Sequence, residues 1–106
     1  MTIHFWKMSG AGNDFIAVDN RQDTFPTDEN ERHALIARIC RRRLDIGADG
    51  VLLVEPPVEA GSHFRMRYYN SDGGEAETCG NGARCIARFA HELGIAPASM
   101  RFDTSA

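Results

Sequence analysis

A short segment, CGNGARC at residues 79–85, combines a thiol with small residues directly before a stretch of helical periodicity. A cysteine at the start of a helix lies beside amides without intrahelical acceptors and near the positive end of the helix dipole, and both lower the pKa of its thiol. Gly80, Asn81 and Gly82 add little bulk, so their amides can approach a small anion such as a carboxylate. The pattern predicts a thiolate base at Cys79 beside a carboxylate cradle, which is the apparatus for removing a proton next to a carboxylate. On spacing alone, a role of Cys79 in turn geometry is an equal alternative.

The other two cysteines receive no chemical role. Cys40 falls on the apolar face of a predicted helix, where a thiol is expected to be a small core residue. Cys85 lies inside the second predicted helix, either in the core or next to the site, and its spacing from Cys79 is not a usual zinc spacing. We therefore expect no metal at this pair. Because three is an odd number and the expected compartment is reducing, we expect thiols rather than a disulfide framework.

Two glycine-containing turns hold further polar candidates. Residues 10–14, GAGND, lack the Lys-Ser/Thr of a phosphate loop and precede no helix, so they predict a hairpin turn in which Asn13 tolerates a left-handed backbone. Residues 70–74, NSDGG, also predict a turn. Asn13 and Asn70 can serve as ligands only if the fold brings them to Cys79. The histidines have no converging spacing, and none is a strong catalytic candidate: His4, His33, His63 and His91.

Short strands and two helices must position these residues. Residues 3–8 and 14–19 predict one hairpin, residues 50–55 and 63–70 predict a second, and residues 100–104 resemble a further strand.

The first helix is predicted from Asp28, as N-cap with Glu31 three residues later, to near Gly47, and the basic run at residues 41–43 would be its solvated C-terminal end. Its apolar face would be Leu35, Ile36, Ile39 and Cys40.

The second helix is predicted from about Gly82 to Leu93, with Gly94 as the C-cap signal. Its apolar face would be Ile86, Phe89, Ala90 and Leu93.

Composition limits the chain to one small domain. With 106 residues, of which 42% are hydrophobic and 25% charged, it can build one core. A net charge of -3 argues against nucleic-acid binding, which needs a clustered basic face. No apolar run is long enough to cross a bilayer and no secretory signal is visible, so we expect a cytoplasmic protein without a membrane partner.

Four motifs together resemble the N-terminal half of diaminopimelate epimerase. They are KMSGAGNDF at residues 7–15, GADG at residues 47–50, YNSDGGEAETCGNGARC at residues 69–85 and ARF at residues 87–89. They occur in the family's order and spacing over nearly the whole chain. The resemblance implies an α/β (α+β) fold that forms one half of a two-domain enzyme, with a curved, mostly antiparallel sheet around a central helix. Residues 1–106 would be the N-terminal epimerase domain, incomplete because the C-terminal half is absent.

The resemblance also implies an activity and a site. Such enzymes interconvert LL- and meso-diaminopimelate without metal or organic cofactor, using two cysteines on opposite faces of the substrate α-carbon. Cys79 matches the first of these cysteines. Gly80 and Asn81 match the backbone donors around the substrate carboxylate. Asn13 and Asn70 match side chains that hold the substrate, including its distal amino-acid end.

Two departures from the family pattern bear on these expectations. Some members have a substrate-contacting glutamine where this chain has Gly50, so Gly50 is left out of the site. Family members are also more than twice as long, and neither Cys40 nor Cys85 has the flanking residues of the second catalytic cysteine. We therefore expect a truncated product or fragment that is inactive alone, and that pairs with the C-terminal half or with itself; the full-length form would be a homodimer. The alternatives are a related racemase or isomerase, such as a proline racemase or a phenazine-type isomerase, and a non-catalytic amino-acid-binding half-domain.

Overall fold

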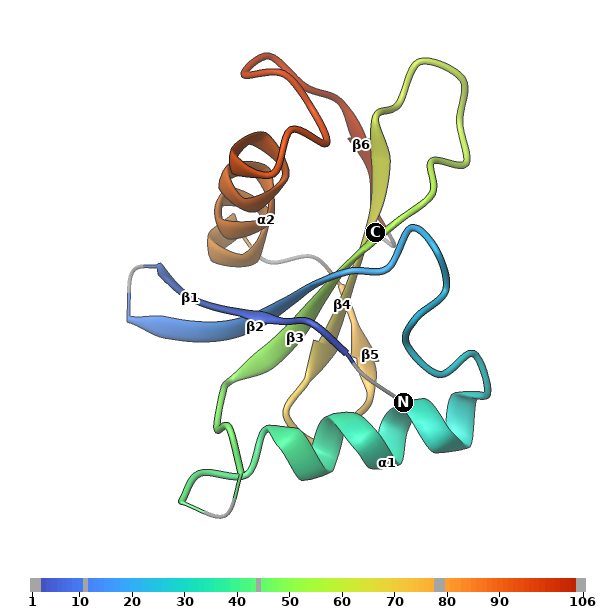
Figure 1. Ribbon diagram of the computed structural model, residues 1–106. Coiled ribbons are helices and arrows are strands. Elements are labelled where there is room, and N and C mark those ends of the chain that lie inside the picture. Colours follow the sequence, from blue (N-terminus) through green and yellow to red (C-terminus); the bar gives the residue numbers. More distant parts are fainter. Residues whose placement is uncertain (1–2, 11, 44, 78–79, 105–106) are drawn as a thin grey trace.

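A six-stranded sheet lies between two helices in the computed structural model, which describes residues 3–10, 12–43, 45–77 and 80–104 (Figure 1). The elements are β1 (Trp6–Gly10), β2 (Asn13–Asp19), α1 (Glu29–Ile39), β3 (Gly50–Glu55), β4 (Phe64–Asn70), β5 (Glu75–Ala76), α2 (Gly80–Glu92) and β6 (Phe102–Asp103). The strand order is β1-β2-β3-β4-β5, and β6 pairs with β4. Three pairings are antiparallel, whereas β2–β3 and β4–β6 are parallel. The predicted α+β class with a mostly antiparallel sheet is confirmed.

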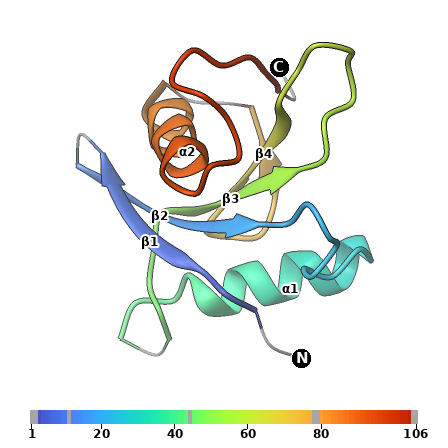
Figure 2. The same ribbon diagram turned by 45° about the horizontal axis from the view of Figure 1, so that its top comes forward.

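The central strands are buried on both faces because each face carries a helix. Figure 2 shows α2 on one side of the sheet and α1 on the other. Successive side chains of a strand point to opposite faces, so Phe15 and Ala17 pack on the side of α2 while Ile16 and Val18 pack on the side of α1. This two-sided burial explains why β3 is a continuous apolar run rather than an alternating one.

Both predicted hairpins are confirmed, with one correction in the first turn. Strands β1 and β2 pair antiparallel, as do β3 and β4. The left-handed residue of the first turn is Gly12, with φ of +92°, and not Asn13, which begins β2. Glycine has no Cβ to oppose this conformation, so it takes the left-handed position.

Helix α1 begins as predicted but ends earlier. The Asp28 carboxylate accepts a hydrogen bond from the Glu31 amide at 2.9 Å, which caps the first turn. The helix ends at Ile39 rather than near Gly47. The chain instead folds back, with the Gly47 amide, at φ of +80°, donating to the Ile39 carbonyl. The basic run at residues 41–43 therefore lies beyond the helix and is not its last turn.

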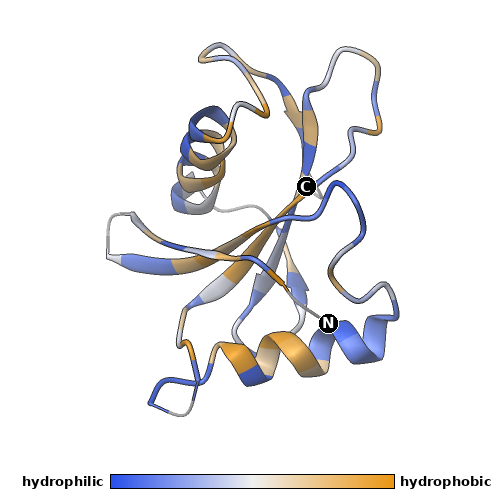
Figure 3. Ribbon diagram, viewed as in Figure 1, coloured by the Kyte–Doolittle hydropathy of each residue, from blue (hydrophilic) through white to orange (hydrophobic). Residues whose placement is uncertain are grey.

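Helix α1 docks on the sheet in two ways along its length. In Figure 3 it changes from hydrophilic in its N-terminal part to hydrophobic in its C-terminal part. The C-terminal part packs Leu35, Ile36 and Ile39 on the apolar cluster of its sheet face. The N-terminal part docks through Arg32, which is only 3% exposed.

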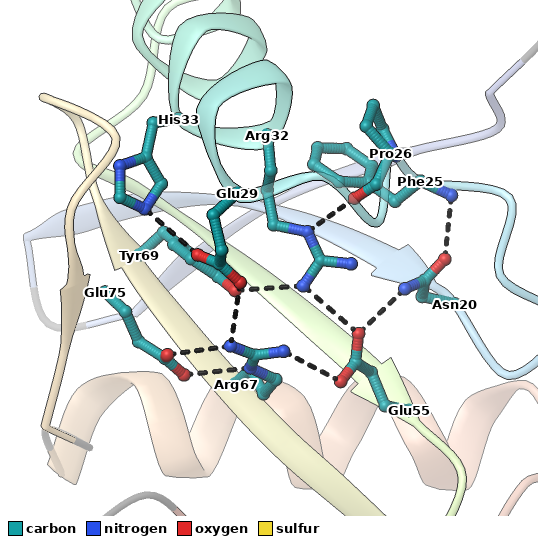
Figure 4. Close-up of polar contacts among 10 residues, drawn as sticks. All are labelled: Asn20, Phe25, Pro26, Glu29, Arg32, His33, Glu55, Arg67, Tyr69 and Glu75. Carbon is teal, nitrogen blue, oxygen red and sulfur yellow. Dashed lines mark hydrogen bonds and ion pairs between the residues drawn. The ribbon is translucent and has the colours of Figure 1, made fainter.

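The contacts of Arg32 are shown in Figure 4. Its Nε donates to the Pro26 carbonyl at 2.7 Å, and its Nη1 donates to the Tyr69 hydroxyl at 2.9 Å. The same nitrogen lies 3.4 Å from the Glu55 carboxylate, which also accepts a hydrogen bond from Asn20 at 2.8 Å. A buried charge is tolerated because it is paired and hydrogen-bonded.

A second arginine extends this network along β4. Arg67 donates two hydrogen bonds to Glu75, at 2.8 and 2.9 Å, and its Nη1 lies 3.6 Å from Glu55. Because Glu75 belongs to β5, the pair ties that short strand to the sheet shortly before the chain enters α2 (Figure 4).

Helix α2 ends in the predicted way. Gly94 has φ of +74°, and the Ile95 amide donates to the Ala90 carbonyl at 2.8 Å, which closes the last turn. Leu93 lies past the helix and is 39% exposed, so its assignment to the apolar face was wrong. Neither helix of the described residues is long and apolar enough to span a bilayer.

Candidate functional site

Helix α2 opens at Gly80, so the predicted thiol immediately precedes it in sequence. Cys79 itself lies outside the described residues, and its role stays a prediction. Gly80 is exposed, and the nearest atom to a Cβ placed there would be Arg84 Nη2 at 3.9 Å. Among the described residues nothing crowds a side chain at Gly80, and the first turn of a helix favours anions.

Two predicted substrate-binding residues are brought together at this helix start. The Asn81 side chain, on the first turn of α2, donates from Nδ2 to Asn13 Oδ1 at 2.8 Å. The two residues are 68 positions apart in sequence. The β1–β2 hairpin places Asn13 at the beginning of β2, and both side chains are only partly buried. This contact joins the hairpin turn to the CGNGARC segment.

Asp49, which has no predicted role, anchors the β2 end of this pair. Its Oδ2 accepts from the Asp14 amide at 2.8 Å and from Asn13 Nδ2 at 3.4 Å. Its own amide donates to the Asp14 carbonyl at 3.0 Å. Phe15 and Gly50 are the first pair in the parallel β2–β3 register. The Asp49 carboxylate therefore provides an acceptor for the Asp14 amide, one residue before that pair.

The negative charges of Asp14 and Asp49 are balanced by basic side chains from the α1–β3 loop and from β1. Arg42 donates to Asp14 at 3.0 Å and to Asp49 at 3.2 Å, and Lys7 lies 3.8 Å from Asp14. The hydrogen bond from the Asp14 amide, followed by those from Asn13 and Arg42, holds the pKa of Asp49 below its usual value. Asp49 is thus an acceptor at neutral pH.

Asn70 lies at the same end of the strands as Asn13 but is separated from the Asn13–Asn81 pair. In the register, Gly50 has Phe15 of β2 on one side and Asn70 of β4 on the other. Two strand spacings, about 10 Å, therefore separate the backbone of Asn70 from that of β2. Asn70 is exposed at the mouth of the predicted turn, where the Gly73 amide donates to its carbonyl at 2.9 Å.

Gly50 occupies a position that admits no side chain in this structure. A Cβ there would lie 2.5 Å from the Tyr69 carbonyl oxygen and 2.7 Å from Tyr68 Cε1. A glutamine at this position would require the strands to shift.

The two described cysteines are buried thiols on opposite faces of the sheet. Cys40 packs under α1, and burial raises the pKa of its thiol to about 11. Cys85 packs in the cluster under α2, with its Sγ 2.9 Å from where a Gly10 Cβ would lie. The core role predicted for Cys40 is confirmed, and Cys85 belongs to the core below the helix start.

A cavity beside Asn81 has a volume of about 170 Å³. It lies between the end of β1 and α2 and is lined by Ser9, Gly10, Asn81, Arg84, Cys85 and Arg88. Arg84 and Arg88 are both exposed. Both are engaged, Arg84 with Asn81 at 2.7 Å and Arg88 with Glu92 at 3.0 Å. The helix start is therefore the feature of this cavity that favours a small anion.

Asp49, Arg42 and Arg84 complete this arrangement, and the sequence alone predicted no role at the site for any of them. Asp49 and Arg84 lie within GADG and CGNGARC, which were noted only as motifs. The contact of Asp49 with Asn13 depends on long-range pairing that spacing alone does not reveal, whereas Arg84 and Asn81 lie three positions apart on α2 and could meet on spacing alone.

Solved structures with the same fold define its class. A methylitaconate-delta-isomerase superposes with a TM-score of 0.75 at 17% identity, over 91% of this chain and 49% of that one. A PhzF-family phenazine biosynthesis protein of Bacillus anthracis gives 0.63 at 21% identity, over 97% of this chain and 32% of that one. The chain therefore shares its fold with these two proteins.

Sequence comparison gives the family within that class. The profile of diaminopimelate epimerase matches residues 5–106. Proteins with that name are 39% identical in Aquifex aeolicus, over 98% of this chain, and 50% identical in Synechococcus sp. (strain JA-2-3B'a(2-13)), over 88%. A chloroplastic one from Oryza sativa subsp. japonica is 50% identical over 86%. The chain belongs to the diaminopimelate epimerase family. It spans 39%, 31% and 25% of the length of these three relatives.

Proposed function

We propose that this chain supplies one half of the active site of a cofactor-independent diaminopimelate epimerase, with Cys79 as one of its two acid/base thiols. Family membership supports the reaction. The proposal rests mainly on the Asn13–Asn81 hydrogen bond, which joins two predicted substrate-binding residues at the start of α2. This helix begins at Gly80, the residue after Cys79.

The reaction inverts the carbon that bears an amino group and a carboxylate. One thiolate removes the α-proton, and a thiol on the opposite face returns a proton to the carbanion. Cys79 would act on one face, and a second cysteine, from the complementary half, on the other. The carbanion is high in energy, so fixed dipoles must meet the charge that spreads onto the carboxylate.

The residues around the start of α2 fit the binding of that carboxylate. The amides of Gly80 and Asn81 belong to the first helical turn, where backbone donors and the helix dipole favour an anion. Asn70, displaced along the sheet edge, would hold the distal amino-acid end of the elongated substrate, and Asn13 would hold the part between.

This arrangement predicts that the chain needs a partner for turnover. An acid and a base must be held on opposite faces of one carbon, and neither Cys40 nor Cys85 is exposed to serve as the second. We propose that the complementary half of the enzyme supplies it, and that the full-length protein is a homodimer. Self-association of this chain with two Cys79 residues across one cleft is the other route to two thiols.

A turnover assay separates this proposal from a non-catalytic amino-acid-binding role. The chain is mixed with a separately produced C-terminal half of a family member, and the conversion of LL- to meso-diaminopimelate is followed by chiral chromatography. We expect turnover by the mixture and none with Cys79→Ser, because an alcohol is a far poorer base than a thiol. Cys40→Ser, on the opposite sheet face, is the matched control and should retain turnover. Binding of diaminopimelate without conversion would favour the non-catalytic role.

A further inference from the structure

Four side chains form a continuous hydrogen-bonded chain across the start of α2. Arg84 Nη2 donates to Asn81 Oδ1 at 2.7 Å, and Asn81 Nδ2 donates to Asn13 Oδ1 at 2.8 Å. Asn13 Nδ2 then donates to Asp49 Oδ2 at 3.4 Å. The chain runs from helix α2 through the beginning of β2 to the residue before β3.

The two ends of this chain fix the direction of every bond in it. An arginine side chain can only donate hydrogen bonds, and an ionised carboxylate can only accept them. Arg84 therefore requires the oxygen of Asn81, and Asp49 requires the nitrogen of Asn13. Turning either amide over would place two donors or two acceptors against each other.

Asp49 is itself held firmly enough to impose this direction. Its carboxylate also accepts from the Asp14 amide at 2.8 Å and from Arg42 at 3.2 Å. These contacts come from β2 and from the loop after α1, so the carboxylate is fixed from two sides. They also keep it ionised at neutral pH.

We propose that Asp49 and Arg84 are positioning residues, which fix the amide orientations of Asn13 and Asn81 and so set the pattern of donors and acceptors offered to the amino-acid substrate. Each amide has two protons and two lone pairs, and the chain engages one of each on Asn13 and on Asn81. The remaining proton and lone pair of each amide can therefore meet a zwitterionic ligand only in one fixed arrangement. This inference rests on the proposed function for its substrate, but the orientation itself does not.

A matched control variant is available for each end of this hydrogen-bonded series of side chains. Asp49→Asn keeps the size of the side chain but removes the acceptor-only end. Asp14→Asn makes the same charge change at the neighbouring carboxylate, which binds the same arginine but whose side chain does not contact the Asn13 amide. Arg84→Gln removes the donor-only end, and Arg88→Gln, one turn along α2 and bonded to Glu92, is its control.

The orientation is tested by nuclear magnetic resonance of the ¹⁵N-labelled 106-residue chain. The side-chain amide signals of Asn13 and Asn81 report directly on their hydrogen bonds. We expect Asp49→Asn and Arg84→Gln each to shift both signals and to raise the hydrogen exchange rate of the Asn13 amide with solvent about tenfold. Transmission from Arg84 to Asn13, which it does not contact, is the distinguishing result. Signals that stay unchanged, or that change equally in Asp14→Asn and Arg88→Gln, would overturn the proposal.

The consequence for substrate is tested with the complementary half present. We expect Asp49→Asn to raise KM for diaminopimelate about tenfold with a much smaller change in kcat, and Asp14→Asn to leave both near their original values. An unchanged KM alongside altered amide signals would overturn the link to substrate. Absence of turnover by the unmodified pair would instead refute the proposed function, while the resonance experiment still decides the orientation. If Asp49→Asn fails to fold, Arg84→Gln, at an exposed position, decides both questions.

Discussion

Replacing Arg32 by methionine tests the polar network that docks helix α1. The change keeps the length of the side chain and removes its charge and its donors. The variant loses the hydrogen bonds to the Pro26 carbonyl and the Tyr69 hydroxyl, and the ion pair with Glu55. All three groups lie where α1 meets the sheet, so water cannot readily replace the guanidinium.

The size of the effect follows from what remains around Glu55. Removing one partner of a buried ion pair costs about 3–5 kcal/mol in free energy of unfolding, because the other charge stays buried. Glu55 keeps Asn20 at 2.8 Å and Arg67 at 3.6 Å, so we expect the low end, about 3 kcal/mol. In a domain of this size such a loss lowers the unfolding midpoint by roughly 10–20 °C.

The assay is urea and thermal unfolding followed by circular dichroism, with Arg38→Met as the control. Arg38 lies on the same helix, but its side chain is 68% exposed and 3.8 Å from Asp45. An exposed ion pair of this kind contributes little, so Arg38→Met should stay within about 0.5 kcal/mol of the original. Equal destabilisation by the two substitutions would refute the assignment of a docking role to the buried network.

Three further predictions concern single residues. Cys79 should react with iodoacetamide at neutral pH faster than Cys40, whose pKa of about 11 keeps it protonated; slower labelling at Cys79 by mass spectrometry would contradict this. Gly50→Ala should lower the free energy of unfolding by about 1–3 kcal/mol, since its Cβ would overlap β4, whereas Gly80→Ala should not clash; equal losses in urea unfolding would count against the geometry. Hydrogen bonds from a serine hydroxyl and backbone amides lower the pKa of Asp103, so its contribution is present above about pH 4 and lost as pH falls through the lower folded-state value. Asp103→Asn should therefore destabilise more at pH 7 than at pH 2, and the reverse order would refute the link.

Local features of this fold were predictable because neighbouring residues determine them. The cap formed by Asp28 and Glu31 needs only residues three apart, and the structure shows it at 2.9 Å. The end of α1 was not predictable in the same way. Helical spacing suggested a longer helix, but Gly47 closes a loop back onto Ile39, and that return depends on the strand that follows.

The candidate site was harder to predict from the sequence, because most of its contacts join residues far apart along the chain. Asn13 and Asn81 were selected through family resemblance, and their contact, across 68 positions, follows only from the packing of α2 against the first hairpin. Asp49 had no predicted role because it reaches Asn13 across 36 positions, whereas Arg84 lies only three positions from Asn81 and its contact could have been predicted from helical spacing. Arg32 is a case similar to Asp49, since nothing in the polar first half of α1 distinguishes a buried arginine from an exposed one.

Proton exchange at the substrate α-carbon shows whether this chain carries one thiol of a two-thiol epimerase. LL-diaminopimelate is incubated in D2O with the chain alone, with the C-terminal half alone and with both, and deuterium at the α-carbon is measured together with inversion. We expect exchange with inversion for the two halves together, its loss in Cys79→Ser, and no inversion by either half alone. Inversion by the isolated chain, or unchanged inversion with Cys79→Ser, would contradict this expectation.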